Sequence, residues 1–380
     1  MRICFSDKKR ALFPKLKTVL CFLMISATIQ RGFSEDSQIL ILQSADSNEN
    51  HFSGGEFVSI LRGNVVFTYG DLKISSSEAR WWRNRGTVNF NRNVRVERPS
   101  QLITCDRMNF TRDENTLKAS GNFFFYDTLE QTTLRGQHAE YNLETSEFSI
   151  TGNPVLERVD TLNSDTLIIT GKSMDYRDRE RAAGVRGEVN IAKGPLSARA
   201  GSADFFSQSN SVRLELEPQI HYETHVVEGD IAEIFFAGEE LQKAKVMGNA
   251  FVVYTEYSPR NSDTTLTNIW SDTLVLSTAE SGNLDTLFAF GNVVTRYFEQ
   301  NDTLHVNEAT GREMVLSFDQ GGVLENAVIR GNARSIYYIE DSDGKGYNKA
   351  SGDSIVVFFE EGRTRRIRLS GGTRGVYYSQ

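Results

Sequence analysis

Cysteine, proline and long apolar segments are all scarce in this 380-residue chain. Only three cysteines are present, and six prolines stand beside thirty glycines. After residue 34, no apolar stretch approaches the roughly 20 residues that a membrane-spanning helix needs. The formal net charge of −8 argues against non-specific nucleic-acid binding, which requires a basic surface. We therefore expect no nucleic acid among the partners.

Sequence patterns that mark catalytic or metal sites are missing or incomplete. The chain contains neither Gly-x-Ser-x-Gly nor a Cys/His pair suited to nucleophilic catalysis. Residues 171–173 resemble the end of a phosphate loop, but Thr166 stands where the earlier glycine is required. Residues 341–346 begin like a calcium loop, yet Lys345 replaces an acidic ligand and Gly352 replaces the final glutamate. We expect no catalytic residue, no metal and no cofactor, and hence no enzyme.

Among the five histidines, His221 and His225 form the sequence His-Tyr-Glu-Thr-His. On a helix this spacing could bind zinc. The surrounding pattern instead predicts one strand, in which positions four apart are separated by about 13 Å. That distance is too long for a single metal ion, so we interpret both as surface or turn residues.

The N-terminus has the parts of a secretory signal peptide. Basic residues are concentrated in residues 8–17, and an apolar run follows at residues 18–29. The run is short for a signal anchor, and cleavage after Ala27 or after Ser34 fits the small residues there. We predict a signal peptide over residues 1–34 and export to the periplasm.

Cysteine placement agrees with that prediction. Cys21 lacks small residues before it, which disfavours a lipoprotein site. Cleavage removes Cys4 and Cys21 and leaves Cys105 alone. The mature chain would then have no internal disulfide, and its stability must come from strand pairing and burial.

A short phrase containing glycine recurs at intervals of about thirty to forty residues. Such a repeat is typical of stacked supersecondary units. Clear copies have Gly-Asn at Gly63, Gly121, Gly152, Gly248, Gly291 and Gly331, and weaker copies lie at Arg92-Asn93, Gly187-Glu188 and Gly371-Gly372. Glycine and asparagine tolerate positive φ, so the phrase predicts a bend at a fixed point of each unit.

A second phrase alternates with the first. It consists of a small or acidic residue, one further residue and an apolar-x-apolar triplet, as in Asp106 to Phe110 and Gly201 to Phe205. In four successive units the triplet precedes the next bend by 13 residues, whereas the distance from bend to triplet varies between 16 and 26. Variable spacing indicates surface loops on one side of the stack.

Strand segments around both phrases alternate apolar with polar residues, which is typical of half-buried strands. No segment keeps a helical period of useful length. We predict an all-β, elongated, solenoid-like stack of about nine repeats with an apolar interior. Residues 35–247 would form short repeats, and residues 248–380 would continue the stack with longer, loop-decorated repeats.

The two alternating phrases resemble those of the OstA-like family, which includes the periplasmic lipopolysaccharide-transport protein LptA and the N-terminal domain of LptD. The resemblance is carried by the Gly-Asn-Val phrases at Gly63 and Gly291 and by the triplets at Ala139 and Ala203, and it extends over residues 39–378. It implies a twisted β-jellyroll, open along one side, whose apolar groove holds the acyl chains of lipid A. It further implies a non-enzymatic role in a bridge carrying lipopolysaccharide, or a related lipid, from the inner to the outer membrane.

Candidate lipid-contacting residues are the large apolar side chains at the repeating inward positions. They are Phe67, Trp81, Phe110, Phe125, Tyr141, Tyr176, Ile191, Phe205, Tyr222, Phe236, Val252 and Tyr254. The same side chains could simply fill a closed β-solenoid that serves as an envelope scaffold or adhesin. A polysaccharide-acting β-helix enzyme is a third reading, weakened by the lack of a recurrent acidic cluster on one face.

Both ends of the stack would expose strand edges, which pair readily with other chains. Residues 38–42 open the stack, and residues 375–378 close it after the basic run 363–368. We expect these edges to join other OstA-like, LptC-like or LptD-like envelope proteins, or to assemble copies head to tail. Alternatively, the arginines act as gatekeepers that prevent such pairing.

Overall fold

The computed structural model describes residues 39–379, except residues 54, 160–165, 178, 223, 238–239, 259–262, 280–282, 300–303, 342–343 and 361–362. The expected signal peptide lies outside the described residues. The chain divides into two compact units, which separate between Ser209 and Asn210. We refer to residues 39–209 as the N unit and to residues 210–379 as the C unit. Among the described residues, no helix has the length and apolar character needed to cross a membrane.

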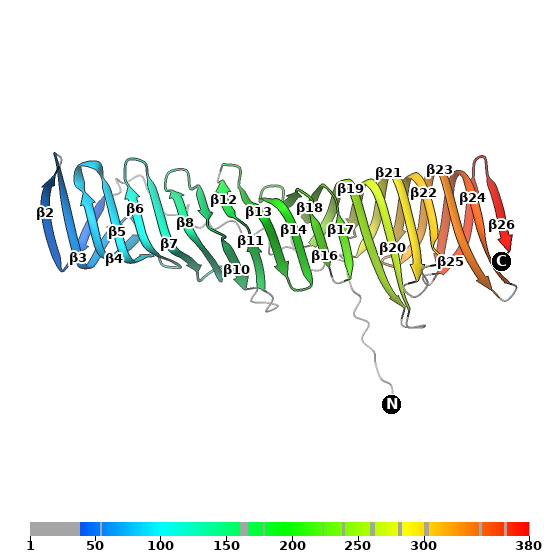
Figure 1. The fold of residues 1–380 in the computed structure, drawn as a ribbon, viewed down its shortest axis with the longest axis horizontal. Helices are drawn as coiled ribbons and strands as arrows, with labels where there is room; N and C mark the ends of the chain where they lie inside the picture. The colour runs from blue at the N-terminus through cyan, green and yellow to red at the C-terminus, as the bar shows by residue number, and fades with distance from the viewer. Residues whose placement is uncertain are drawn as a thin grey trace, which may run out of the picture. The chain divides into compact units, whose positions relative to one another are not determined.

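The N unit consists of antiparallel strands and one 3-10 turn (Figure 1). The elements are β1 (Leu40–Ser44), β2 (Ser47–Ser53), β3 (Glu56–Tyr69), β4 (Leu72–Trp82), η3 (Arg83–Arg85), β5 (Thr87–Glu97), β6 (Gln101–Thr111), β7 (Thr116–Asp127), β8 (Thr132–Asn142), β9 (Phe148–Thr151), β10 (Val155–Val159), β11 (Thr166–Thr170), β12 (Ser173–Arg177), β13 (Ala182–Lys193) and β14 (Leu196–Phe206).

The C unit is also built of antiparallel strands, which confirms the all-β prediction for both units. They are β15 (Ser211–Glu215), β16 (Gln219–Tyr222), β17 (His225–Glu228), β18 (Ile231–Ala237), β19 (Glu240–Ser258), β20 (Asp263–Thr278), β21 (Leu284–Glu299), β22 (Asn307–Phe318), β23 (Leu324–Asp341), β24 (Gly344–Glu360), β25 (Arg363–Ser370) and β26 (Arg374–Ser379).

Most strands of the N unit bend in the middle, and their two arms belong to two facing layers. In the pairing of β6 with β7, the register shifts between Thr104 and Arg107, so that the two arms pair separately. We call layer A the arms at residues 47–53, 56–62, 78–91, 107–120, 138–142, 148–151, 173–177, 182–186 and 202–206. Layer B comprises the arms at residues 40–44, 65–76, 94–104, 123–136, 155–159, 166–170 and 189–200.

The glycine phrase lies at the bend, as predicted. Gly121 has a φ of 76° and Asn122 a φ of 48°, and the same pair of left-handed residues recurs at every phrase, including the weak copies. One further bend, at Leu216 and Glu217, has φ values of 65° and 58° but no glycine. The sequence reading missed it because left-handed backbone is uncommon for such residues.

A side-chain clip explains why the two phrases alternate. The acidic residue that opens the second phrase accepts a hydrogen bond from the asparagine of the bend. Asn122 Nδ2 donates to Asp106 Oδ2 over 2.9 Å, and Asn64 Nδ2 donates to Asp46 Oδ2 over 3.0 Å. At one bend the clip is an ion pair between Lys172 and Glu188 instead.

The longer repeats of the C unit contain long strands. After the bend at Gly248, β19 pairs with β20 continuously from Ala250 to Ser258. Hydroxyl and β-branched residues such as Thr264, Thr265 and Thr267 fit a pleated surface, which is why a polar segment still forms strand. The compositional change expected near residue 247 falls within β19.

Edge strands occur where the sequence reading placed them. Among the described strands, β1 and β2 each pair only with β3, and β25 and β26 each pair only with β24. Large apolar side chains are exposed there: Ile39, Ile41, Phe52, Phe57, Ile367, Val376, Tyr377 and Tyr378.

Candidate functional site

The interior of the N unit begins with closely packed aromatic rings from both layers. Phe67 meets the ring edges of Trp81 and Phe90, with centroids 5.4 Å apart in each case. Tyr69 of layer B then contacts Phe110 of layer A at 5.0 Å. Because these rings reach across the space between the layers, this part of the interior is a filled core.

Beyond Phe110 an apolar cavity of about 100 Å³ lies between the layers, and the rings of Phe123 and Phe148, 6.3 Å apart, form part of its lining. Layer A contributes Met108, Leu117, Ala119, Ala139, Tyr141, Phe148, Met174 and Tyr176, and layer B contributes Leu72, Val96, Ile103, Phe123, Phe125, Leu134 and Leu156. Leu143 lies in the adjoining turn. Engineered apolar cavities of about 150 Å³ stay dry and bind benzene, so this space is suited to part of an alkyl chain.

Three of the twelve candidate lipid-contacting residues line the cavity: Phe125, Tyr141 and Tyr176. Of the others in the N unit, Phe67, Trp81 and Phe110 belong to the packed aromatic core, whereas Ile191 and Phe205 are buried without lining the cavity. The remaining four belong to the C unit, where Tyr222 and Phe236 are buried and Val252 and Tyr254 are half-buried.

Sequence reasoning missed most of the cavity lining, although a signal for it exists. Met108 and Phe123 stand two residues from Phe110 and Phe125 on the same strands, and therefore face the same way. Each bent strand places side chains from both arms into the interior. Counting inward positions on either side of every bend would have found Leu117, Ala119 and Leu134 as well.

Polar groups border the cavity at the hairpin turns. Arg98 lines it with a side chain only 11% exposed, and its guanidinium lies 3.3 Å from the Asp71 carboxylate. Gln101 donates a 2.9 Å hydrogen bond to Asp127, whose other oxygen accepts the backbone N–H of Leu129. These partners neutralise the border, so the lining presents almost purely apolar chemistry.

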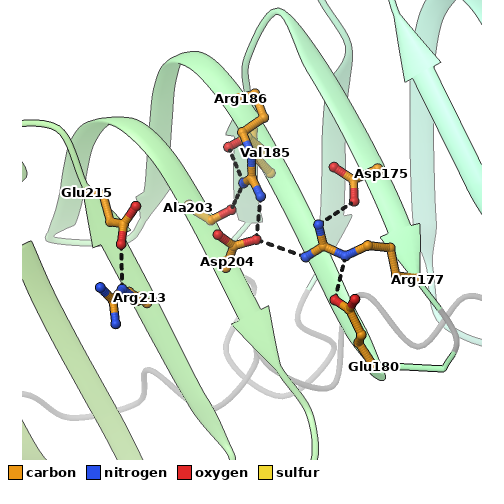
Figure 2. A network of polar contacts seen from close by, with 9 residues as sticks. All are labelled: Asp175, Arg177, Glu180, Val185, Arg186, Ala203, Asp204, Arg213 and Glu215. Carbon is orange, nitrogen blue, oxygen red and sulfur yellow. Dashed lines mark hydrogen bonds and ion pairs between the residues drawn. The ribbon is translucent and has the colours of Figure 1, made fainter.

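A charged network holds the outward side of layer A beside the cavity (Figure 2). The guanidinium groups of Arg186 and Arg177 converge on Asp204, at 2.6 and 3.1 Å. Arg177 also lies near Asp175 and Glu180, and Arg186 donates to two backbone carbonyls of the same layer. Burial lowers the pKa of Arg177, but the surrounding carboxylates outweigh it and raise the pKa above its ordinary value. Two guanidinium groups are shared among three carboxylates, and each charge has a partner of opposite sign, which marks a structural brace.

Within the C unit a smaller set of ion pairs plays the same part. Arg213 lies 2.5 Å from Glu215 on its own strand (Figure 2). It also lies 2.9 Å from Glu233, which ties β15 to the neighbouring β18.

Cys105 of β6 is buried, and its thiol donates to the backbone carbonyl of Arg107 over 3.2 Å. Burial, together with the Asp106 carboxylate, raises its pKa from 9.0 to about 12. The folded protein should therefore resist iodoacetamide at pH 8 and react at the ordinary thiol rate once unfolded. Since the unfolded thiol ionises first, Cys105 should also cost stability as the pH rises from 9 toward 12. Equal alkylation of native and denatured protein would contradict this placement.

The histidine pair is arranged differently from the prediction of one strand. His221 lies on β16 and His225 on β17, and the two strands pair antiparallel, with Tyr222 opposite His225. The His225 ring stacks on Tyr254 at 5.0 Å, and its Nδ1 accepts the backbone N–H of Thr255. Within the described part of the chain, no group of three or more His, Cys, Asp or Glu residues is placed to hold a metal ion.

Comparisons with known proteins provide little further evidence about this site. No protein-family model matches the sequence, and no curated protein matches it. Among solved structures, the chain is similar to LptH of Pseudomonas aeruginosa, described as the LptA-homologous periplasmic component of the lipopolysaccharide transport device. The match covers 38% of this chain and 82% of LptH, with 10% identity and a TM-score of 0.20.

Proposed function

We propose that this chain is a non-enzymatic lipid-binding protein that takes acyl chains between its two layers. The observation that carries the proposal is the apolar cavity of the N unit, which has an almost wholly apolar lining. Burial of apolar area at about 25 cal/mol per Å² makes entry of an alkyl chain favourable there. The resemblance of the two alternating phrases to OstA-like proteins supports lipopolysaccharide, or a related lipid with several acyl chains, as the cargo.

The setting we propose is the periplasm of a diderm bacterium, reached after removal of residues 1–34. Edge strands β1, β2, β25 and β26, with their exposed apolar side chains, would extend the sheets of partner proteins or of further copies. A series of such units would pass lipid from the inner to the outer membrane.

A second function, a closed β-solenoid acting as scaffold or adhesin, draws on a different observation. The rings of Phe67, Trp81, Phe90 and Phe110 fill the interior at one end of the N unit and leave no room for a ligand there. The two functions differ in whether lipid reaches the cavity beyond Phe110.

Site-specific photo-crosslinking in cells separates them. A benzophenone amino acid at Tyr141, which lines the cavity, should capture a lipid detectable with an antibody against lipid A. The matched control is Glu140, the neighbour on β8, whose exposed side chain points the opposite way. Lack of a lipid adduct at Tyr141, Phe125 and Tyr176 alike would favour the scaffold.

A further inference from the structure

On the outward surface of layer A, one row of residues is directly paired from strand to strand. On every second strand, the member of this row lies three positions before the bend. In the N unit this outer row is polar or small for most of its length: Arg80, Asn89, Asn109, Lys118, Glu140, Ser149, Asp175, Gly184 and Asp204. In the C unit the corresponding row begins with the ion-paired Arg213 and Glu233 and continues as Lys245, Val275, Phe288, Val315, Val328, Val356 and Arg368. Its centre is wholly apolar.

The change is also visible in the repeating phrase. In the first copy of the second phrase in the C unit, the residue three positions after its first residue is Glu233. In the later copies that residue is a valine, at Val275, Val315 and Val356. Each of these valines is half-buried and stands beside a buried interior residue such as Leu274 or Met314. Strands that are apolar on both faces are typical of sheets covered on both sides.

Aromatic side chains widen this outer surface, and cations border it. Phe290, two residues after Phe288 on β21, is 40% exposed. Phe358 lies two residues after Val356 on β24, and the Arg366 guanidinium is 4.2 Å from its ring centroid. The cations on outward positions are Lys243, Lys245, Arg330, Arg366 and Arg368. The carboxylates beside them are Glu313 and Glu233, and Glu233 is ion-paired with Arg213. We call this apolar row with its basic border the basic apolar face.

A second copy of the chain is a poor occupant of this face. The apolar stretch from Val275 to Val356 is flanked by Lys245 on one side and Arg368 on the other, so a two-fold contact that superposes two such stretches sets like charges against each other. The charge pattern requires an anionic partner, although the chain as a whole carries a net charge of −8.

We propose that the basic apolar face docks on an anionic lipid bilayer. Valine and phenylalanine side chains enter the boundary between headgroups and acyl chains, and lysine and arginine extend their charged ends to lipid phosphates. The inference rests on the proposed function only in placing the chain beside membranes, and it assigns a surface separate from the acyl cavity.

Vesicle sedimentation with the full mature chain tests this assignment. Vesicles of phosphatidylglycerol mixed with phosphatidylcholine should bind it roughly tenfold more tightly than phosphatidylcholine alone, and added salt should weaken the binding. Replacing Lys243 and Lys245 with glutamine should remove most of that preference. The matched control, Arg80→Gln with Lys118→Gln on the N unit, should leave it intact. Equal binding to both vesicle types, or no loss in the Lys243/Lys245 variant, would overturn the proposal.

The apolar row needs a separate variant, because charge alone attracts proteins to anionic surfaces. Val275→Thr, Val315→Thr and Val356→Thr together keep side-chain shape and strand propensity while adding hydroxyl groups. This variant should bind several-fold more weakly at high salt, with unchanged circular dichroism. A benzophenone at Val315 should give lipid adducts in cells, and a protein-sized adduct in their place would overturn the choice of a bilayer. Acyl-probe binding in the N-unit cavity should be unaffected by every one of these variants, so a failure here is distinct from failure of the proposed function.

Discussion

Gly121→Ala is expected to lower the free energy of unfolding of the N unit by about 2–3 kcal/mol. Gly121 has a φ of 76°, a conformation that costs an alanine about 1–2 kcal/mol. An added Cβ would also lie 2.4 Å from Asp106 Oδ2, so the carboxylate must move and give up its hydrogen bond from Asn122. That bond contributes roughly another 1 kcal/mol.

A double-mutant cycle separates the two costs. In an Asp106→Ala background the clash disappears, so Gly121→Ala should cost only the backbone strain. Gly375→Ala in the C unit, where the backbone is not left-handed and a Cβ has open space, is the control and should leave the N-unit transition unchanged. Denaturation in a Trp270→Phe background makes Trp81 and Trp82 report the N unit alone. Equal costs of Gly121→Ala with and without Asp106 would show that the clip does not couple to the bend.

Ala119→Phe is expected to weaken binding of an acyl probe to the N unit by at least about tenfold. Ala119 is buried and lines the cavity, and a phenyl ring built there occupies the space that an alkyl chain would need. Overpacking costs about 1–3 kcal/mol, so the variant should remain folded with a lower melting temperature. Fluorescence titration with a labelled fatty acid measures the affinity.

The control for this variant is Lys118→Phe on the same strand. Lys118 points outward and is 51% exposed, so the same ring added there leaves the cavity unchanged. Lys118 forms an ion pair with Glu140, and such a pair contributes little at the surface. Equal loss of probe affinity in both variants would place the binding site elsewhere.

The bends and the strand faces were predictable from sequence because each depends on local chemistry. Gly-Asn allows positive φ, and period-two alternation assigns each side chain to a face. The bend at Leu216 and Glu217 lacks that chemistry and was missed. His221 and His225 were misplaced on one strand, since a two-residue turn leaves no glycine or proline to mark it.

The cavity itself could not be predicted, because its position depends on how far side chains from two layers reach toward each other. Tyr69 meets Phe110 across the interior, whereas the shorter Ala119 and Ala139 line the cavity together with Leu134 and Leu156. The spacing of residues along the sequence does not determine how far their side chains reach into the interior. The same limit applies to the basic apolar face, whose row is assembled from seven strands and becomes visible only through strand register.

The central claim is that an acyl chain occupies the space between the layers of the N unit, and methionine methyl NMR with a spin-labelled fatty acid tests it most directly. Met108 and Met174 line the cavity, whereas Met247 and Met314 belong to the C unit. The account predicts strong broadening of the Met108 and Met174 signals at one equivalent of ligand, with Met314 unchanged. Uniform broadening of all four signals, or broadening confined to the C unit, would contradict it.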